Sequence, residues 1–302
     1  MSSFEILVVG SVALDTVETP FGKIEEGLGG SATHFSVAAS FFAPVSLVAV
    51  VGEDFSQRHI DFLSSRNINL DSLQKQTGKT FRWKGKYEYD LNTAHTLQTE
   101  LNVFERFLPE LSPSLKKKEI LFLANIDPTL QSRVIDQSTS PKLIAMDTMN
   151  FWIEGKKEEL IRTLKRVQML LINEGEVREL AQESNLVKAV RKIRSWGPTT
   201  VAVKRGEYGA LLFHNEEVFS APGLPLEEVK DPTGAGDSFA GGFLGYLAKT
   251  SDFSFANLKK ASIYGSTMAS FNVEDFSLDR MRTLTNVEIE KRYQEFCRLT
   301  VF

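Results

Sequence analysis

Short apolar runs recur along the chain and alternate with longer amphipathic stretches. The runs are rich in β-branched residues and cover positions 6–9, 46–51, 120–123, 143–145, 169–172 and 200–203. Continuous apolar runs are typical of parallel strands that helices cover on both faces of a sheet. The pattern therefore predicts an α/β fold with a doubly wound, mostly parallel sheet.

Three of the stretches between these runs have apolar residues at helical spacing, which predicts amphipathic helices at 55–66, 156–166 and 186–195. The sequence Thr285-Asn-Val-Glu288 is a capping-box pattern that predicts the start of a final helix. Residues 27–52 carry no charged side chain. Because glycine, serine and Pro44 interrupt them, we predict a buried helix followed by a buried strand rather than a membrane span.

The region 79–104 breaks the alternation of runs and helices. Aromatic residues flank Gly85 with a period of two, and a second extended run covers 97–103. The aromatic residues are Phe81, Trp83, Tyr87 and Tyr89. This pattern predicts two or three antiparallel strands that form a lid over a site or pair with a second copy of the chain. A β-meander packed on the domain edge is the alternative.

Composition and charge exclude several classes of protein. The chain has 302 residues and a net charge of −4, so it lacks the general positive surface that binding along a nucleic acid needs. Its single cysteine, Cys297, cannot form an intrachain disulfide, which favours a reducing cytoplasm. The first nine residues do not resemble a signal peptide. We expect a cytoplasmic protein with no membrane partner.

The segment 231–243, DPTGAGDSFAGGF, is the strongest chemical signal. Gly234 and Gly236 allow the backbone to approach a ligand, and a helix start exposes N–H groups that bind anions. Asp237 would lie in the first turn of that helix, where the helix dipole is expected to keep it ionised and able to accept a proton from a hydroxyl group. The alternative is that Asp237 is only a favourable residue at a helix start.

Three common phosphate-binding motifs are absent. The chain has no Gly-x-x-x-x-Gly-Lys-Ser/Thr loop and no His-Arg-Asp catalytic loop. Residues 10–15, GSVALD, lack the three glycines of a dinucleotide-binding fingerprint. A dinucleotide-dependent oxidoreductase is therefore a remote alternative.

Segment 231–243 closely resembles the C-terminal signature of the ribokinase-like (PfkB) carbohydrate kinases. Further landmarks of that family occur in order along the chain, at residues 10–15, 29–30, 52–54, 173–176 and 204–209. The resemblance implies a ribokinase-like kinase domain over residues 1–302, with a β-lid formed mainly by 79–104 and with 17–28 as a second candidate segment.

The resemblance implies roles for the signature residues. Asp237 resembles the general base that deprotonates the acceptor hydroxyl, and the amides of Gly234, Ala235 and Gly236 resemble the anion hole for the transferring phosphoryl group. Thr233, in the same loop, is assigned to phosphate binding. Phosphoryl transfer depends mostly on charge stabilisation and positioning, which such a cluster of N–H donors supplies.

Two further elements resemble the parts of the family that handle phosphate and magnesium. Asn173 and Glu176 match an Asn-x-x-Glu element, in which Glu176 acts on the metal through water, although the same pattern is also a plain capping box. Arg205 and Gly206 match the loop that borders the nucleotide phosphates, although a tight turn between strands explains them nearly as well.

The acceptor site is expected near the first strand and the glycine pair. Asp15 resembles the family's aspartate that binds sugar hydroxyls, with simple turn chemistry as the alternative. Gly29 and Gly30 would let the backbone approach the acceptor. His34 stands where many members of the family carry asparagine, and a satisfied helix histidine is its alternative reading. Asn125 follows a strand at its carboxyl end, where open α/β sheets bind ligands.

The sequence thus predicts an ATP-dependent kinase that phosphorylates an alcohol group of a small sugar, polyol or nucleoside. Its expected cofactors are ATP and Mg²⁺, with a monovalent cation as a further candidate, and a homodimer through the lid is expected. The alternative from another class is a non-catalytic protein that senses a sugar or nucleotide on a kinase-like fold.

Overall fold

A nine-stranded sheet forms the middle layer of the molecule. The computed structural model describes residues 3–301, and its large sheet has the strand order β13-β12-β11-β10-β9-β8-β1-β4-β5. Neighbours from β11 to β5 pair in parallel, whereas β12 pairs antiparallel with both β11 and β13. The strands are β1 (Ile6–Val9), β4 (Val45–Gly52), β5 (Ile68–Gln76), β8 (Ile120–Leu123), β9 (Leu143–Asp147), β10 (Met169–Asn173), β11 (Thr200–Lys204), β12 (Ala210–His214) and β13 (Glu217–Ala221).

Both faces of the large sheet are buried. In β1, Ile6 and Val8 belong to one hydrophobic core, and Leu7 and Val9 belong to the other. Each of the six apolar runs lies in a strand of this sheet. The structure therefore confirms the predicted α/β fold, and it explains why the runs are continuous: a strand with two buried faces has no position for an exposed side chain.

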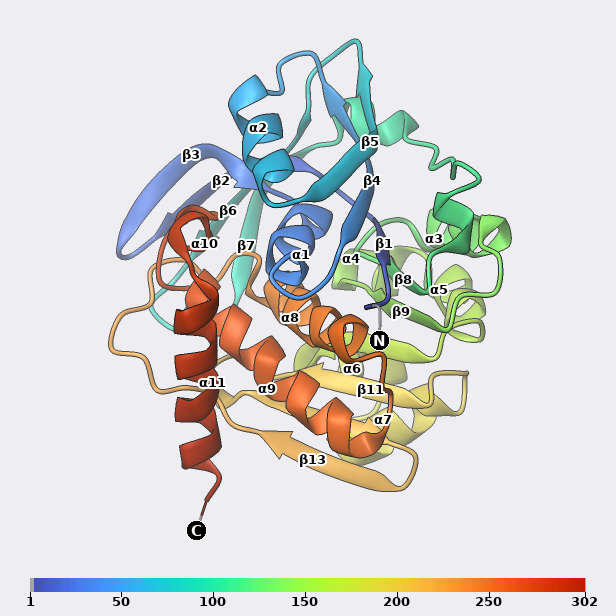
Figure 1. The fold of residues 1–302 in the computed structure, drawn as a ribbon, viewed down its shortest axis with the longest axis vertical. Helices are drawn as coiled ribbons and strands as arrows, with labels where there is room; N and C mark the ends of the chain where they lie inside the picture. The colour runs from blue at the N-terminus through green and yellow to red at the C-terminus, as the bar shows by residue number, and fades with distance from the viewer. Residues whose placement is uncertain (1–2, 302) are drawn as a thin grey trace.

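Helices form the two outer layers (Figure 1). One layer comprises α1 (Ser31–Ala39), α2 (Gln57–Ser65), α8 (Ala235–Thr250), α9 (Phe255–Asn272), α10 (Asp279–Thr283) and α11 (Asn286–Leu299). The other comprises α3 (Pro128–Gln137), α4 (Asn150–Gly155), α5 (Lys157–Leu164), α6 (Glu174–Ala181) and α7 (Leu186–Arg194). Short 3₁₀ helices cover Asn102–Arg106, Leu115–Lys117 and Gly206–Tyr208. The predicted helices are present, and Thr285 and Glu288 form the predicted capping box of α11.

The uncharged segment 27–52 folds mainly into α1 and β4, which confirms the predicted helix and strand. Every residue of both elements is buried within the protein. Within residues 3–301, no helix is long and apolar enough to span a bilayer.

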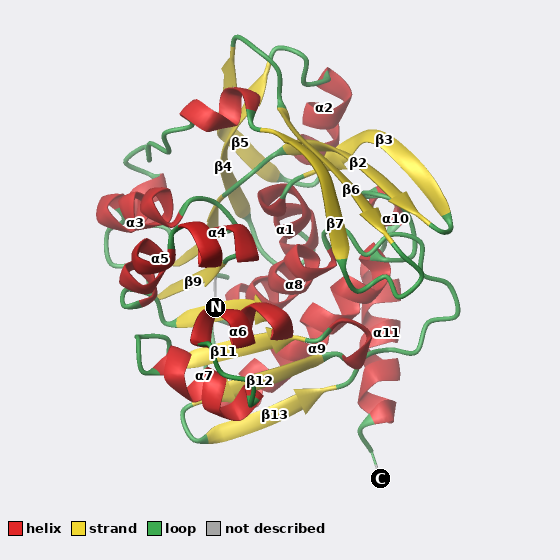
Figure 2. Ribbon diagram, turned by 180° about the vertical axis from the view of Figure 1, so that it is seen from behind, coloured by secondary structure: helices red, strands yellow, loops and turns green. Residues whose placement is uncertain are grey.

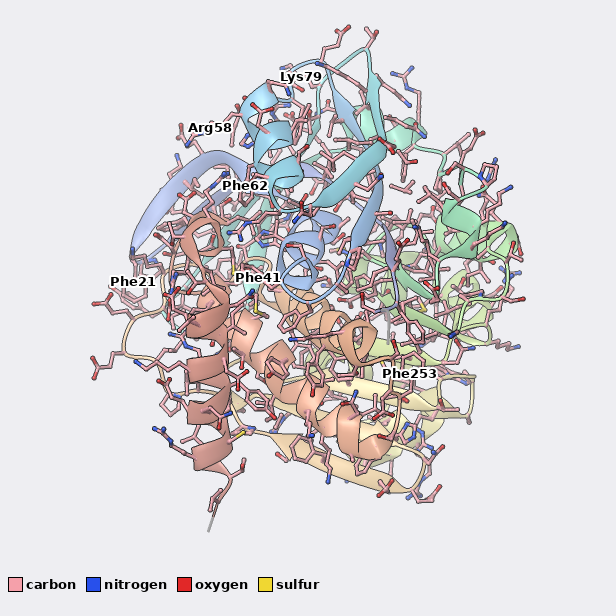
Figure 3. The ribbon with its side chains drawn as sticks, viewed as in Figure 1. Phe21, Phe41, Arg58, Phe62, Lys79 and Phe253 are labelled. Carbon is pink, nitrogen blue, oxygen red and sulfur yellow. The ribbon has the colours of Figure 1, made fainter. Side chains whose placement is uncertain are left out.

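A four-stranded second sheet forms the predicted lid region, and Figure 2 shows it as a separate layer beside the large sheet. Its order is β3-β2-β6-β7, with β2 at Ala13–Thr19, β3 at Gly22–Gly29, β6 at Phe81–Tyr87 and β7 at Ala94–Glu100. Both predicted segments, 79–104 and 17–28, contribute strands. Phe21, at the turn between β2 and β3, projects into solvent at the end of this hairpin (Figure 3).

Two details of the lid differ from the prediction. The second strand of its 79–104 segment ends at Glu100, because Asn102 has a positive φ of 52° and starts a 3₁₀ turn that buries Val103. The two hairpins are antiparallel, but β2 pairs in parallel with β6. The parallel pairing arises because β2 and β6 follow β1 and β5, which are parallel strands of the large sheet and end at the same edge.

Candidate active site

The signature loop enters α8 through a tight turn. Asp231 is buried, and its carboxylate accepts hydrogen bonds from the backbone N–H groups of Thr233 (2.9 Å) and Ser277 (3.2 Å). Gly234 then caps α8 with a left-handed backbone conformation, φ 75°. A β-carbon at Gly234 would overlap the ring of His34, so only glycine fits this position.

His34 lies beneath the signature loop, and it is almost fully buried. Its Nδ1 donates a hydrogen bond to Oδ1 of Asn272 (2.9 Å), and the Ser238 hydroxyl donates to the same oxygen (2.9 Å). The Asn272 amide nitrogen in turn donates to the carbonyl oxygen of Thr233 (2.7 Å). Burial lowers the pKa of His34 to about 4, so the ring is neutral. The ring thus supports the loop from below, and its predicted role toward the acceptor stays a prediction.

Asp237 lies in the first turn of α8, as predicted, beside the amides of Gly234, Ala235 and Gly236. Within residues 3–301, no group donates a hydrogen bond to its carboxylate. Burial raises its pKa to about 8, and the neighbouring Asp147 raises it further, whereas Lys204 opposes the shift. In the ligand-free protein, burial thus acts against the ionised state that the helix dipole was expected to favour, and the role of Asp237 as a base stays a prediction.

A buried ion pair lies next to the signature loop. The Lys204 ammonium group, at the end of β11, donates a hydrogen bond to Oδ2 of Asp147, at the end of β9, with an N–O distance of 2.8 Å. A β-carbon at Gly236 would lie 3.0 Å from Lys204 Nζ. The sequence analysis assigned no catalytic role to Lys204 or to Asp147. The available signal was that both residues end parallel strands at the carboxyl edge of the sheet.

Asn173 and Glu176 form the capping box that was the alternative reading of this motif. Asn173 Oδ1 accepts a hydrogen bond from the Glu176 backbone N–H (2.8 Å), and Glu176 Oε2 accepts one from the Asn173 N–H (3.0 Å). Burial raises the pKa of Glu176, and the positive charge of Lys204 opposes this shift. Glu176 therefore belongs to the same charged cluster as Lys204, and its role toward a metal stays a prediction.

A cavity of about 630 Å³ opens beside the N-terminus of α8. Its walls come from the β11–β12 loop, the segment 223–229, α8, α9 and the lid loop that joins β6 to β7. Gly206 lines it, and a β-carbon there would lie 2.6 Å from Oδ1 of Asn92 in that lid loop. Arg205 forms an ion pair with Glu174 (2.6 Å). Lys204 and Gly236 line the end of the cavity nearest the ion pair with Asp147.

Asp15 lies at a separate position, in β2, which is itself a strand of the lid. Its Oδ2 accepts a hydrogen bond from the Gly30 N–H (3.3 Å), whereas its buried Oδ1 has no partner within residues 3–301. Burial raises the pKa of Asp15 to about 7. A β-carbon at Gly29 would overlap the Asp15 carboxylate, so glycine is required for this close approach. The free Oδ1 is suited to accept a hydrogen bond from a ligand hydroxyl group.

Asn125 lies at the carboxyl end of β8, as predicted. Its Oδ1 accepts a hydrogen bond from the Trp152 ring N–H (3.0 Å), and its amide nitrogen contacts the Met149 sulfur at 3.0 Å. These contacts orient the amide group from α4 and the preceding loop. The role of Asn125 toward an acceptor stays a prediction.

The lid touches the signature loop directly. Thr233 Oγ1 donates a hydrogen bond to the Tyr87 hydroxyl (3.4 Å) at the end of β6, and burial raises the pKa of Tyr87 to about 12. The lid therefore lies against both the predicted catalytic loop and the cavity wall.

The side chains present would leave most of the coordination of a magnesium ion to other ligands. Within residues 3–301, no group of three or more His, Cys, Asp or Glu side chains could hold a metal ion. An ion that keeps its water and phosphate ligands, with one carboxylate such as Glu176 acting through water, fits this donor set. Magnesium in this protein would then arrive with a nucleotide.

The comparisons with known proteins agree with this geometry. Residues 4–283 match the pfkB family of carbohydrate kinases. The cytidine kinase of Thermococcus kodakarensis is 30% identical over 248 residues, which cover 80% of this chain and 87% of that protein.

Two solved structures share the fold. The nucleoside kinase of Methanocaldococcus jannaschii, an archaeal member of the ribokinase family, has a TM-score of 0.78 and 21% identity, covering 98% of this chain and 100% of that one. The nucleoside kinase of Burkholderia thailandensis, solved with inosine, has a TM-score of 0.80 and 18% identity, covering 96% and 97%. Because the family match spans most of the residues and includes the loop before α8, the chain belongs to the pfkB family of carbohydrate kinases and is a sugar or nucleoside kinase.

Proposed function

We propose that this kinase transfers the γ-phosphoryl group of ATP to a hydroxyl group of a nucleoside. Membership of the family implies the use of ATP. The nucleoside is proposed because the cytidine kinase and the nucleoside kinases named above, and a further nucleoside kinase from Methanothermobacter thermautotrophicus, are similar to this chain over most of its length. Sugars and polyols are the other acceptor classes to test.

The carboxylate of Asp237 is the observation that carries the proposal. It has no hydrogen-bond donor within residues 3–301, and it directly follows residues 234–236, of which Ala235 and Gly236 line the 630 Å³ cavity. A base with a raised pKa accepts a proton more readily than an ordinary aspartate once it is ionised. We propose that Asp237 takes the proton of the acceptor hydroxyl while the three amides stabilise the transferring phosphoryl group.

The substrates are proposed to occupy two neighbouring regions. The cavity beside α8 takes the nucleotide, with Thr233, Arg205, Gly206 and Asn173 around its phosphates. Asp15, with its unpartnered Oδ1, binds acceptor hydroxyls together with the segment Gly29–Gly30 and Asn125, and the buried His34 supports the signature loop beneath Gly234. Magnesium, carried by the nucleotide and held through water by Glu176, neutralises phosphate charge. A monovalent cation is not assigned to any residue.

The test is ADP release from Mg-ATP against a panel of nucleosides, pentoses, hexoses, hexose phosphates and inositols, with wild type and Asp237→Asn side by side. We expect a nucleoside to give the highest kcat/KM. The variant should lose roughly 10²- to 10⁴-fold in kcat, the usual contribution of a general base.

Turnover by Asp237→Asn at the wild-type rate would remove Asp237 from the mechanism. A preference for a free sugar over every nucleoside would overturn the acceptor class while leaving the kinase intact. The proposed homodimer through the lid is tested by the molar mass in solution at micromolar concentration, and a monomer would contradict it.

A further inference from the structure

We propose that Lys204 is a catalytic residue whose ammonium group binds the transferring phosphoryl group, and that Asp147 is the positioning residue that holds this ammonium group in place. The proposal rests on the proposed function, because it places the γ-phosphate of ATP beside the N-terminus of α8. Lys204 would add a side-chain cation to the anion hole, which the sequence analysis assigned to backbone amides alone.

The ammonium group of Lys204 lies next to the amide cluster at the start of α8. Lys204 Nζ lies 3.0 Å from the point that a β-carbon at Gly236 would occupy, so it is adjacent to the residue that ends the amide cluster. Both Lys204 and Gly236 line the cavity. A ligand anion that accepts hydrogen bonds from the amides of α8 therefore lies next to this ammonium group.

The ammonium group of Lys204 also has hydrogen-bond donors that the described part of the protein does not use. An ammonium group has three N–H donors, and within residues 3–301 Asp147 is the hydrogen-bond partner of Lys204, with an N–O distance of 2.8 Å. Asp147 is itself almost fully buried, and its Oδ1 accepts a second hydrogen bond from the Thr148 N–H (2.8 Å). The carboxylate is thus fixed by its own backbone, and it holds the ammonium group while leaving donors for a ligand.

The charges of the side chains around Asp237 also favour a cation at this position. The ionisable groups that act most strongly on Asp237 are Asp147 on β9, Asp15 on β2, Glu176 on α6 and Lys204 on β11. Tyr87 on β6 also faces this group of carboxyls. Lys204 is the one cation in this set, so without it none of these side chains would offset the charge of an entering triphosphate. The position suits a lysine that offsets phosphate charge and would be unfavourable for a neutral residue.

The acceptor oxygen attacks the γ-phosphorus, the bond from that phosphorus to the β–γ bridging oxygen breaks, and ADP leaves with the bond electrons. The proton of the acceptor hydroxyl passes to Asp237. Lys204 donates hydrogen bonds to the phosphoryl oxygens and stays protonated throughout, so it stabilises charge and transfers no proton.

The test compares Lys204→Met, which removes the charge at similar length, with Lys204→Arg, which keeps it. Lys118→Met is the matched control, because Lys118 also forms an ion pair, with Glu5, but at the opposite edge of the sheet. Binding of ADP and of the non-hydrolysable analogue AMP-PNP is measured by calorimetry for each protein. Rates are measured over a range of pH.

We expect Lys204→Met to weaken AMP-PNP binding at least tenfold and ADP binding less than threefold, because ADP lacks the γ-phosphate. Its kcat should fall by about 10²- to 10³-fold, the usual cost of one oxyanion donor. The acidic limb of its kcat/KM profile should move to higher pH, because Lys204 no longer lowers the pKa of Asp237. Lys204→Arg should keep much of the AMP-PNP affinity and much of kcat, and Lys118→Met should match wild type.

Equal losses of ADP and AMP-PNP affinity, or a kcat within threefold of wild type, would overturn the proposal and leave Lys204 as a structural counter-ion. If Lys204→Met does not fold, Lys204→Gln and Lys204→Arg decide by the same affinity ratio. A wild-type protein that binds both nucleotides and phosphorylates no acceptor would instead contradict the proposed function, because the affinity ratio needs no acceptor.

Asp147→Asn tests the positioning role. It keeps the shape of the side chain and removes the charge that holds the ammonium group. We expect the AMP-PNP to ADP affinity ratio and kcat to change in the same direction as in Lys204→Met, by about tenfold. A loss of thermal stability with both values unchanged would show that the pair is only structural.

Discussion

Asp15 and Asp237 are carboxyl groups that the fold places where water reaches them poorly. Burial is the largest cause of both raised pKa values, to about 7 and about 8. When folding raises the pKa of an acidic group, the folded protein keeps a proton at pH values at which the unfolded chain has already lost it. Between about pH 4 and 8, these two groups therefore release protons on unfolding, and their contribution to the stability of the ligand-free protein falls as the pH rises.

We predict that Asp237→Asn makes the ligand-free protein more stable at pH 8 to 9, because asparagine removes the cost of ionising a buried group. The gain over wild type should be about 1 kcal/mol or more, and it should shrink as the pH falls and vanish below about pH 4, where Asp237 is protonated in both the folded and the unfolded state. Urea unfolding at four pH values measures it. Asp71→Asn, at an exposed position of β5, should show no such trend. A gain that is independent of pH would contradict the assigned cause.

His34 is a buried residue whose effect on stability should be independent of pH above about 7, because its pKa is lowered to about 4 in the folded protein and lies near 6.5 in the unfolded chain. We predict that His34→Ala lowers stability by about 2–4 kcal/mol, since it leaves a cavity beneath Gly234 and removes a partner of Asn272. It should also lower kcat about tenfold by loosening the signature loop. Thermal unfolding and kinetics measure both. The exposed His95→Ala is the control, and equal effects of the two changes would refute this role.

At the scale of elements, α8 packs unusually close to its neighbours through glycines. A β-carbon at Gly241 would lie 2.5 Å from the Phe35 carbonyl oxygen in α1, and one at Gly242 would lie 2.6 Å from the Tyr264 carbonyl oxygen in α9. This packing fixes the axis of α8 and hence the direction of the N–H groups at its start. Gly241 and Gly242 therefore help to position the N–H groups of the site, although they lie further along α8.

We predict that Gly241→Ala destabilises the protein by about 1–3 kcal/mol, because the added methyl group meets backbone atoms that cannot rotate away. Gly155→Ala, at the end of α4, is the matched control. Its β-carbon would have nothing within 4 Å, so stability should stay constant or rise slightly. Chemical unfolding of both variants gives the comparison. A neutral Gly241→Ala would mean that α1 and α8 can separate at little cost.

The elements that sequence reasoning predicted correctly are those with a local signal. The buried strands have unbroken apolar runs, and α11 has its capping box. The strand β5 escaped prediction because it lies at the edge of the sheet, where residues such as Asp71 and Lys75 face solvent. Its pattern is mixed, and only the pairing with β4 defines it as a strand.

The sequence predicted the part of the site in which a single motif supplies both the carboxylate and the backbone amides beside it. Asp237 and residues 234–236 lie within four positions of each other, so their proximity follows from the chain. Lys204 and Asp147 are 57 residues apart, and they meet because β9 and β11 both neighbour β10. Asn272 reaches the loop from the far end of α9. Such contacts depend on the order of strands and helices, which the local pattern does not encode.

At the scale of the whole molecule, the lid is attached to the large sheet through a polar junction. Asp54, just after β4, accepts hydrogen bonds from the backbone N–H and hydroxyl of Thr80 (2.8 and 2.7 Å) and forms an ion pair with Arg82 (2.8 Å). Arg82 belongs to β6, so this junction fixes the base of the lid strand that reaches the signature loop.

We predict that Asp54→Ala raises the KM for the acceptor about tenfold, because β6 is no longer held in its position beside β2, the strand that carries Asp15. The KM for ATP should change less than threefold, and the unfolding temperature should fall by several degrees. Steady-state kinetics with each substrate varied in turn measures the two KM values separately. An equal rise in both KM values would show a general loss of structure instead. Glu105→Ala, at an exposed position beyond the lid, is the control.

The parallel pairing of β2 with β6 also has a consequence for how the protein assembles. The two hairpins of the lid lie more than fifty residues apart in the chain, and the ladder between β2 and β6 joins them. Neither hairpin has its neighbour until β1, β4 and β5 have paired, since these strands bring both chain exits to one edge. The lid should therefore be among the last parts to gain protection from hydrogen exchange during refolding, and nascent chains that stop before residue 81 would expose half of it as an unpaired β-ribbon.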